Sequence, residues 1–100
     1  LLQEELAERA ASLGDRLRNG FREALAGQEG VEDIRGQGLM LGLELACDCG
    51  ELVGRALERG LLINVTAGNV VRLLPPLILS DAEADDLVAR VIALVREFTA

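Results

Sequence analysis

Leucines occupy every second position from Leu39 to Leu45, and this alternation restricts the fold more than any other feature of the chain. A two-residue period predicts a β-strand with one apolar face, here over Leu39–Ala46. The opposite face carries Met40, Gly42, Glu44 and Ala46. Gly42 leaves a gap on that face, which indicates a close approach by another group. Because the leucine face needs a cover, the strand predicts a sheet packed against helices.

Two long segments repeat apolar residues every three or four positions, which is the period of an amphipathic helix. They are Leu1–Ala26 and Asp81 to about Phe98. Ser80 and Glu83 have the spacing of a capping box at the start of the second helix. Gly14 and Gly20 lie inside the first helix, where each costs about 1 kcal/mol relative to alanine. We therefore expect another element to pack closely against them.

A shorter helix is predicted over Cys49–Arg59. Asp48 and Glu51 repeat the capping-box spacing before it, and Gly60 follows its last turn. The residues expected to be buried in this helix are Leu52, Val53, Ala56 and Leu57.

Three more strands complete the predicted sheet. Their ranges are Val31–Arg35, Leu62–Val65 and Val70–Leu74. Gly36-Gln37-Gly38 is a predicted turn or bulge, and Thr66–Asn69 is a predicted hairpin loop in which Gly68 and Asn69 tolerate positive φ. Pro75-Pro76 ends the last strand, since neither residue donates a backbone hydrogen bond. The predicted fold class is α+β: a two-layer sandwich with a small, mostly antiparallel sheet and helices on one face.

Residues 1–100 are expected to form a single domain, since a chain of this length rarely holds two. No apolar run approaches the roughly 20 residues that span a membrane, and no basic leader is present. We therefore expect a soluble, cytoplasmic domain. The first helix opens without a cap residue or an initiator methionine, which predicts that the chain is part of a longer protein.

The chain has ten arginines and seventeen aspartates and glutamates, for a net charge of −7. This acidic balance argues against nucleic-acid binding. The chain has no lysine, histidine, tyrosine or tryptophan. It therefore lacks a Schiff-base nucleophile and the usual general base and metal ligand. Cys47 and Cys49 match neither a zinc knuckle nor a thioredoxin-type motif, so free thiols are expected. We predict no catalytic residue and no metal site in this chain.

Arg72 is the candidate binding residue, because it is the one charged residue in the apolar stretch Leu61–Leu77. A guanidinium stays charged at every accessible pH, so in apolar surroundings it needs an anion. One interpretation is an internal ion pair with Glu44 or with an acidic helix residue. The other is a contact with the carboxylate of a bound molecule, which the planar guanidinium fits bidentately. The spacing of the residues leaves both interpretations open.

Two motifs resemble segments of one enzyme family. The first is RGQGLMLGLEL (Arg35–Leu45), which is similar to the R-G-x-G-L-M-x-G-x-E-L segment of the class III, pyridoxal-phosphate-dependent aminotransferases. The second is GLLINVTAGNVVRLLPPLIL (Gly60–Leu79), which resembles a later segment of the same family, most closely in its acetylornithine aminotransferases. The resemblance covers essentially the whole chain, but only the C-terminal part of the family's length.

The resemblance implies that this chain is the small C-terminal domain of a fold-type I aminotransferase and that Arg72 contacts a substrate carboxylate. The enzyme would be a homodimer that moves the amino group of N-acetylornithine to 2-oxoglutarate in arginine biosynthesis. Pyridoxal phosphate and the catalytic lysine would belong to the large domain. This chain alone is therefore expected to bind no cofactor and to be inactive.

Other functions share parts of this evidence. Aminotransferases for ornithine, succinylornithine or 4-aminobutyrate have the same two motifs. Without the resemblance, the chain also fits a self-contained α+β module that binds a small acidic ligand through Arg72. A third alternative is a structural domain whose open sheet face serves only dimerisation.

Overall fold

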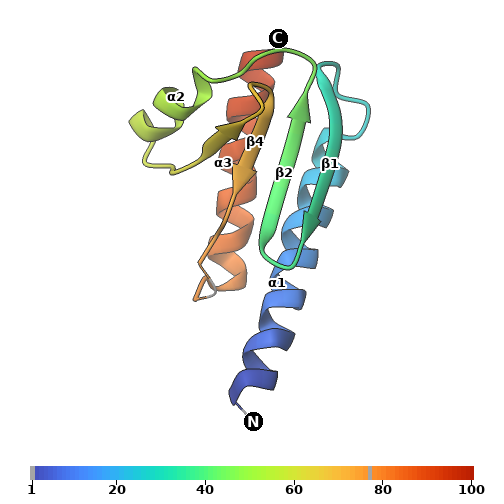
Figure 1. The fold of residues 1–100 in the computed structure, drawn as a ribbon, viewed down its shortest axis with the longest axis vertical. Coiled ribbons are helices and arrows are strands. Elements are labelled where there is room, and N and C mark those ends of the chain that lie inside the picture. Colours follow the sequence, from blue (N-terminus) through green and yellow to red (C-terminus); the bar gives the residue numbers. More distant parts are fainter. Residues whose placement is uncertain (1, 77) are drawn as a thin grey trace.

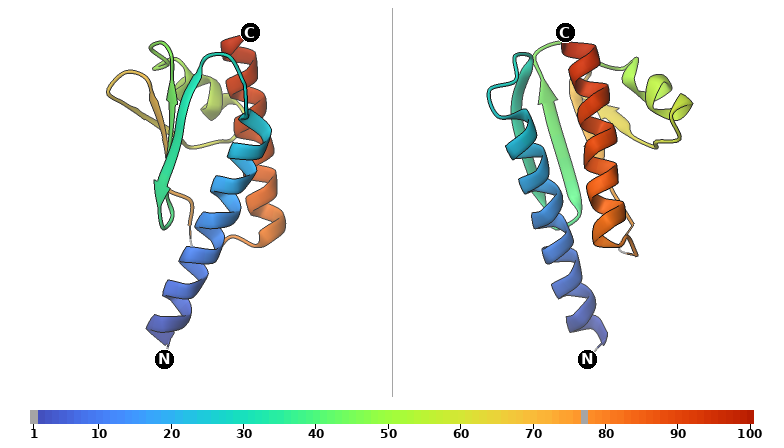
Figure 2. Two further views of the ribbon diagram at one scale, coloured as in Figure 1. Left: turned by 90° about the vertical axis from the view of Figure 1, so that its right-hand side faces the viewer. Right: turned by 180° about the vertical axis from the view of Figure 1, so that it is seen from behind.

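The computed structural model describes residues 2–76 and 78–100; Leu1, where the first predicted helix starts, and Leu77, where the apolar stretch ends, lie outside the described residues. The elements in chain order are α1 (Leu2–Leu25), β1 (Val31–Gln37), β2 (Met40–Leu45), α2 (Leu52–Glu58), β3 (Asn64–Thr66), β4 (Val70–Leu73) and α3 (Asp81–Thr99) (Figure 1). The strands form one antiparallel sheet in the order β1-β2-β4-β3. Figure 2 shows α1 and α3 side by side on one face of this sheet. The predicted α+β two-layer sandwich is confirmed.

The leucine face of β2 packs into the core, as its two-residue period predicts. Leu41, Leu43 and Leu45 are buried between the sheet and the helices. The buried apolar side chains of α1 are those of Leu13, Leu17, Phe21 and Leu25, and those of α3 belong to Ala84, Val88, Val91, Ile92, Leu94 and Val95. Each large side chain stabilises the fold by roughly 1.5–3 kcal/mol when buried. Within the described ranges, no helix has the length and apolar character needed to cross a membrane.

The two glycines inside α1 mark close contacts, as their sequence positions predict. A Cβ added at Gly14 would lie 2.0 Å from the carbonyl oxygen of Gly38, in the turn between β1 and β2. A Cβ at Gly20 would lie 3.1 Å from a methyl group of Val88 in α3. The low helix propensity of glycine is thus offset by the close approach of α1 to the β1–β2 turn at Gly14 and to α3 at Gly20.

β1 is longer than predicted, because Gly36 and Gln37 belong to the strand and not to a turn. They pair with Leu41 and Met40 of β2. The turn consists of Gly38, with a φ of +57°, and the residue after it. A Cβ at Gly36 would lie 2.6 Å from the carbonyl oxygen of Met40. Close contact with the neighbouring strand, and not chain reversal, therefore accounts for the first glycine of this motif.

α2 begins at Leu52, and the capping box predicted at Asp48 and Glu51 is wrong. Glu51 is the N-cap residue, and no side-chain hydrogen bond caps the helix. The backbone N–H of Cys49 donates instead to the carbonyl of Gly68 (2.8 Å), which ties this segment to the β3–β4 loop. Only part of the predicted core face is correct: Leu52 and Ala56 are buried, whereas Val53 and Leu57 are exposed.

The capping box predicted at the start of α3 is confirmed. The backbone N–H of Glu83 donates to Ser80 Oγ (3.1 Å), and the backbone N–H of Ser80 donates to Glu83 Oε1 (3.0 Å). The hydrogen bond that the Ser80 backbone N–H donates to the Glu83 carboxylate, followed by an interaction of that carboxylate with the Ser80 hydroxyl, lowers the pKa of Glu83. The two hydrogen bonds of the capping box fix the point at which the chain leaves the sheet and begins to cover it.

Arginines of α1 bind the first turns of α3. Arg9 donates to Asp81 Oδ1 (2.9 Å), and Arg16 forms two hydrogen bonds of 2.8 Å with the carboxylate of Asp85. The Arg16 hydrogen bond lowers the pKa of Asp85 from its ordinary value. The contribution of Asp85 to stability is therefore complete above its unfolded-state pKa of about 3.9, and it is lost as the pH falls through the lower folded-state pKa.

Asp85→Asn should lower the urea midpoint of unfolding at pH 7, and its deficit relative to the unaltered chain should shrink as the pH falls below about 4. The reason is that protonation removes the same charge from Asp85 in the unaltered chain. Asp86→Asn is the matched control, because Asp86 pairs with Arg90 of the same helix (2.9 Å). A deficit that stays constant from pH 7 to pH 2 would contradict the account.

Candidate functional site

The face of the sheet opposite the helices, called here the open face, carries polar residues from all four strands. Residues directly opposite each other in antiparallel strands point to the same face. One row across β1, β2, β4 and β3 consists of Arg35, Gly42, Arg72 and Asn64. The next row consists of Asp33, Glu44, Val70 and Thr66. The register therefore places two arginines on the open face, one on each side of a glycine.

Arg72 is fixed at its backbone and free at its guanidinium. Its backbone lies between two paired strands, opposite Gly42 of β2 and Asn64 of β3. β4 ends at Leu73, one residue earlier than predicted, and Pro75 follows soon after it. The side chain is exposed. Among the residues that the structure describes, the guanidinium has no ion-pair or hydrogen-bond partner.

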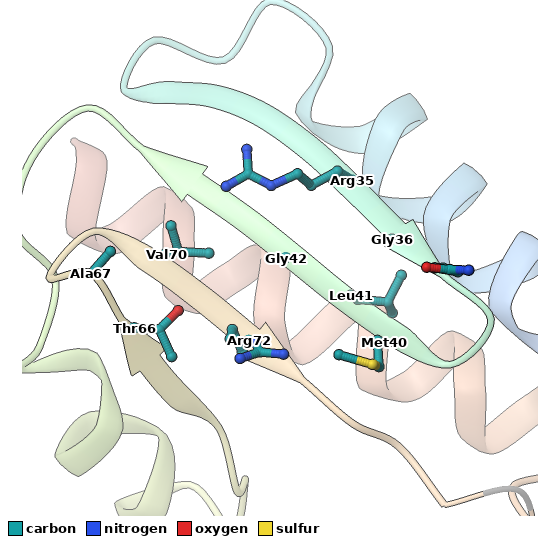
Figure 3. Close-up of a pocket in the computed structure, with 10 residues that line it drawn as sticks. Arg35, Gly36, Met40, Leu41, Gly42, Thr66, Ala67, Val70 and Arg72 are labelled. Atoms are coloured by element: carbon teal, nitrogen blue, oxygen red, sulfur yellow. The ribbon is translucent and has the colours of Figure 1, made fainter.

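Two hollows of the open face share Arg72, and Figure 3 shows residues that line the larger one. The larger one has a volume of about 470 Å³ and is lined by Arg35 and by Thr66 and Ala67 of the β3–β4 loop. The smaller one has a volume of about 390 Å³, and its apolar lining residues include Met40, Leu62 and Leu74. Arg72 thus presents a positive charge beside apolar surface, an arrangement suited to a small molecule that carries a carboxylate.

Glu44, one of the internal partners considered for Arg72, pairs with Arg35 instead. Glu44 Oε1 lies 3.3 Å from Arg35 Nη2, and Asp33 Oδ2 lies 3.2 Å from Arg35 Nη1. Hydrogen bonds with Asp33 and then Glu44 raise the pKa of Arg35. Acidic residues of α1 and α3 lie on the other face of the sheet. The described residues therefore supply no partner for the internal interpretation of Arg72.

Gly42 lowers the surface between the two arginines. A Cβ at this position would lie 3.5 Å from Val70 Cγ1 and 3.8 Å from Arg35 Cγ, which are ordinary van der Waals distances. The close approach expected at Gly42 is therefore not found in the part of the chain that the structure describes. The missing side chain instead leaves room in the larger hollow, which Gly42 helps to line.

The β3–β4 loop has a strained backbone where it borders the larger hollow. The positive φ angles are those of Ala67 (54°) and Gly68 (82°). Gly68 was expected to tolerate a positive φ, whereas Asn69, which was expected to tolerate one as well, does not have it. Left-handed backbone costs an L-residue such as alanine roughly 1–2 kcal/mol. Asn69 holds the loop against β2, because its Nδ2 donates to the carbonyl of Leu45 (3.0 Å) while Leu45 N–H donates to the carbonyl of Asn69 (2.8 Å).

Arg35 and Thr66 line the larger hollow but were not predicted from the sequence as candidate site residues. The signal for Arg35 was available in the position of the turn. A turn of Gly38 and the residue after it pairs Gln37 with the first residue of β2, and this register brings Arg35 opposite Gly42. The only signal for Thr66 was its position at the end of β3. Many residues without a functional role also lie at the end of a strand.

Cys47 and Cys49 lie just after β2 as free thiols, as expected. Cys47 is exposed and Cys49 is buried. Burial, followed by the nearby Cys47 and Asp48, raises the pKa of Cys49, so its thiol is a neutral part of the core. Within residues 2–76 and 78–100, no three His, Cys, Asp or Glu side chains gather into a potential metal site.

The sequence matches the family model "Aminotransferase class-III" over residues 1–95. The chain belongs to the class III aminotransferases. A similar class III relative is acetylornithine aminotransferase 1 of Bordetella pertussis, which is 52% identical over 98 residues. That match covers 98% of this chain and 25% of the relative.

Solved class III structures share the fold. One is an ornithine aminotransferase of Toxoplasma gondii, whose active site is partially occupied by pyridoxal phosphate. It matches with a TM-score of 0.84 and 36% identity, and the match covers 97% of this chain and 24% of that chain. The acetylornithine aminotransferase of Elizabethkingia anophelis matches with a TM-score of 0.83 and 29% identity over 97% and 25%, respectively. This class III chain spans about a quarter of the length of the relatives that it matches.

Arg72→Ala should change the free energy of unfolding of the chain by no more than about 0.5 kcal/mol, because the exposed guanidinium has no partner to lose among the described residues. Urea denaturation at pH 7 measures the change. Phe21→Ala, in the core, is the contrasting variant and should cost about 3–5 kcal/mol. A loss of more than about 1 kcal/mol in Arg72→Ala, the size of a typical hydrogen bond, would instead give Arg72 a structural role.

Proposed function

We propose that this chain is the C-terminal domain of an aminotransferase that moves the amino group of N-acetylornithine to 2-oxoglutarate, in arginine biosynthesis. The 52% identity to acetylornithine aminotransferase 1 supports this choice of substrate. The observation that carries the proposal is Arg72, a guanidinium without an internal partner among the described residues, on the open face of the sheet. In this proposal Arg72 binds a carboxylate of the substrate.

Arg72 is suited to this role by its geometry. A guanidinium offers two parallel N–H donors to a carboxylate, and a hydrogen bond to a charged group contributes about 1.5–3 kcal/mol. Strand pairing on both sides of Arg72 fixes the base of the side chain, so less freedom is lost on binding. When a further part of the protein covers the open face, the neighbouring apolar side chains of Met40 and Leu62 lower the local dielectric and strengthen the attraction.

Pyridoxal phosphate is the proposed cofactor of the whole protein, where it supplies the electron sink for amino transfer. The residues of this chain do not fit it, because the chain has no lysine to form a Schiff base. A lysine elsewhere in the protein must therefore hold the cofactor. The proposed contribution of this chain is limited to binding and orienting the substrate.

A large domain of the same protein is the proposed cover of the open face. Apolar side chains beside Arg72 are strongly exposed: Met40 by 50%, Leu62 by 87% and Leu74 by 76%. Exposed apolar clusters of this kind mark interaction surfaces. The matched relatives have about three-quarters of their length outside this domain, which is enough for such a cover. We further propose that the whole protein is a cytoplasmic homodimer, as the family architecture implies.

Ornithine aminotransferase is the second candidate, favoured by the 36% identity to the Toxoplasma gondii enzyme. The two donors differ at the α-amino group, which is acetylated and uncharged in N-acetylornithine and positively charged in ornithine. A comparison of kcat/KM for the two donors, with 2-oxoglutarate as acceptor, separates the candidates. A preference for ornithine would overturn the proposed substrate while leaving the class of enzyme intact.

Arg72→Ala in the whole enzyme should raise KM for at least one carboxylate substrate by roughly 10- to 150-fold, as expected for the loss of a charge-assisted contact. Arg72→Lys should recover part of this loss, since it keeps the charge but not the bidentate fork. Arg90→Ala, on the helical face, is the matched loss of one arginine. Steady-state kinetics in which Arg72→Ala behaves like Arg90→Ala would rule out the proposed contact.

A further inference from the structure

Glu44 lies diagonally next to two arginines, Arg35 of β1 and Arg72 of β4. Arg35 and Arg72 are both paired with Gly42, one from each neighbouring strand, and Glu44 is two residues further along β2 on the same face. Long side chains reach across such diagonals of a sheet. The structure has Glu44 at Arg35, with 3.3 Å between Oε1 and Nη2, and leaves Arg72 without an anion among the described residues.

We infer that Arg35 is a positioning residue, which holds Glu44 away from Arg72 and so keeps Arg72 free for the substrate carboxylate. This inference rests on the proposed function, because it requires that Arg72 binds a carboxylate. Without Arg35, the remaining arginine of the two rows is Arg72. Glu44 would then form an ion pair with the guanidinium of Arg72 and compete with the substrate carboxylate for it.

Asp33 holds Arg35 in the position that this role requires. The backbone N–H of Ile34 donates to Asp33 Oδ1 (2.9 Å), while Asp33 Oδ2 accepts from Arg35 Nη1 (3.2 Å). The second terminal nitrogen of the Arg35 guanidinium, Nη2, donates to Glu44 Oε1. A single exposed ion pair is weak, but here one end of Arg35 is fixed by a carboxylate that the backbone itself orients. Figure 3 shows the Arg35 side chain running along the sheet and not toward Arg72.

Val70 offers a different explanation for the separation of Glu44 from Arg72. It lies directly opposite Glu44 on β4 and is only 8% exposed. Its Cγ1 lies 3.5 Å from the point where Gly42 would carry a Cβ, on the side of β2 that faces Arg72. If Val70 alone blocks Glu44, removal of Arg35 has no effect on substrate binding. The two explanations therefore predict different kinetics.

The test is a double-mutant cycle on the holoenzyme that contains this chain. Arg35→Gln is expected to raise KM for the substrate that Arg72 binds by about 3- to 10-fold, with kcat little changed, because Glu44 becomes an internal competitor. Glu44→Gln alone should leave KM and kcat unchanged. The double variant Arg35→Gln/Glu44→Gln should return KM to that of the unaltered enzyme, which a merely structural role of Arg35 does not explain.

Two results overturn the inference. A double variant as impaired as Arg35→Gln would mean that Arg35 contacts the substrate or supports the sheet, and an unchanged KM in Arg35→Gln would assign the separation to Val70. Asp33→Asn is the milder variant if Arg35→Gln does not fold; it should raise KM less, and Glu44→Gln should again remove the rise.

Arg72→Ala, measured in the same series, separates the inference from the proposed function. A normal KM in Arg72→Ala refutes the proposed function and the inference with it. A raised KM in Arg72→Ala, together with no rescue of Arg35→Gln by Glu44→Gln, refutes only the role of Arg35.

Discussion

The antiparallel pairing of β4 with both β2 and β3 determines where the guanidinium of Arg72 lies. It sets Arg72 opposite Gly42 and Asn64 on the open face and sends Val71 and Leu73 into the core. A slip of one residue would reverse every side chain of β4 and bury the guanidinium under the helices. The apolar core and the exposed arginine are therefore two consequences of the same register, and the burial of the valine and leucine maintains the site.

The sequence predicted the fold wherever neighbouring residues decide the outcome. The alternation of Leu39–Ala46 needs only a two-residue period, and it gave the inward face of β2 correctly. The capping box at Ser80 forms because both of its hydrogen bonds join residues three positions apart. The candidate Arg72 was also found from local pattern, as a charge within an apolar stretch. These features depend little on the rest of the structure.

The features that the sequence did not predict depend on contacts between distant segments. Asp48 and Glu51 have the spacing of a cap, yet the N–H of Cys49 is bonded to Gly68 of a separate loop, and the helix starts later. Glu44 was considered as a partner of Arg72, but it lies diagonal to Arg35 as well, and strand order alone decides which arginines are neighbours. Such choices follow from the register of the whole sheet.

We propose that Arg72 is kept free of internal anions so that it binds one from a substrate. The most direct measurement is a crystal structure of the whole enzyme with a non-reacting dicarboxylate, such as glutarate, in the active site. The account predicts a carboxylate within hydrogen-bond distance of the Arg72 guanidinium, with Glu44 still at Arg35. An Arg72 paired with a carboxylate of the protein, and a ligand held by other residues, would contradict it.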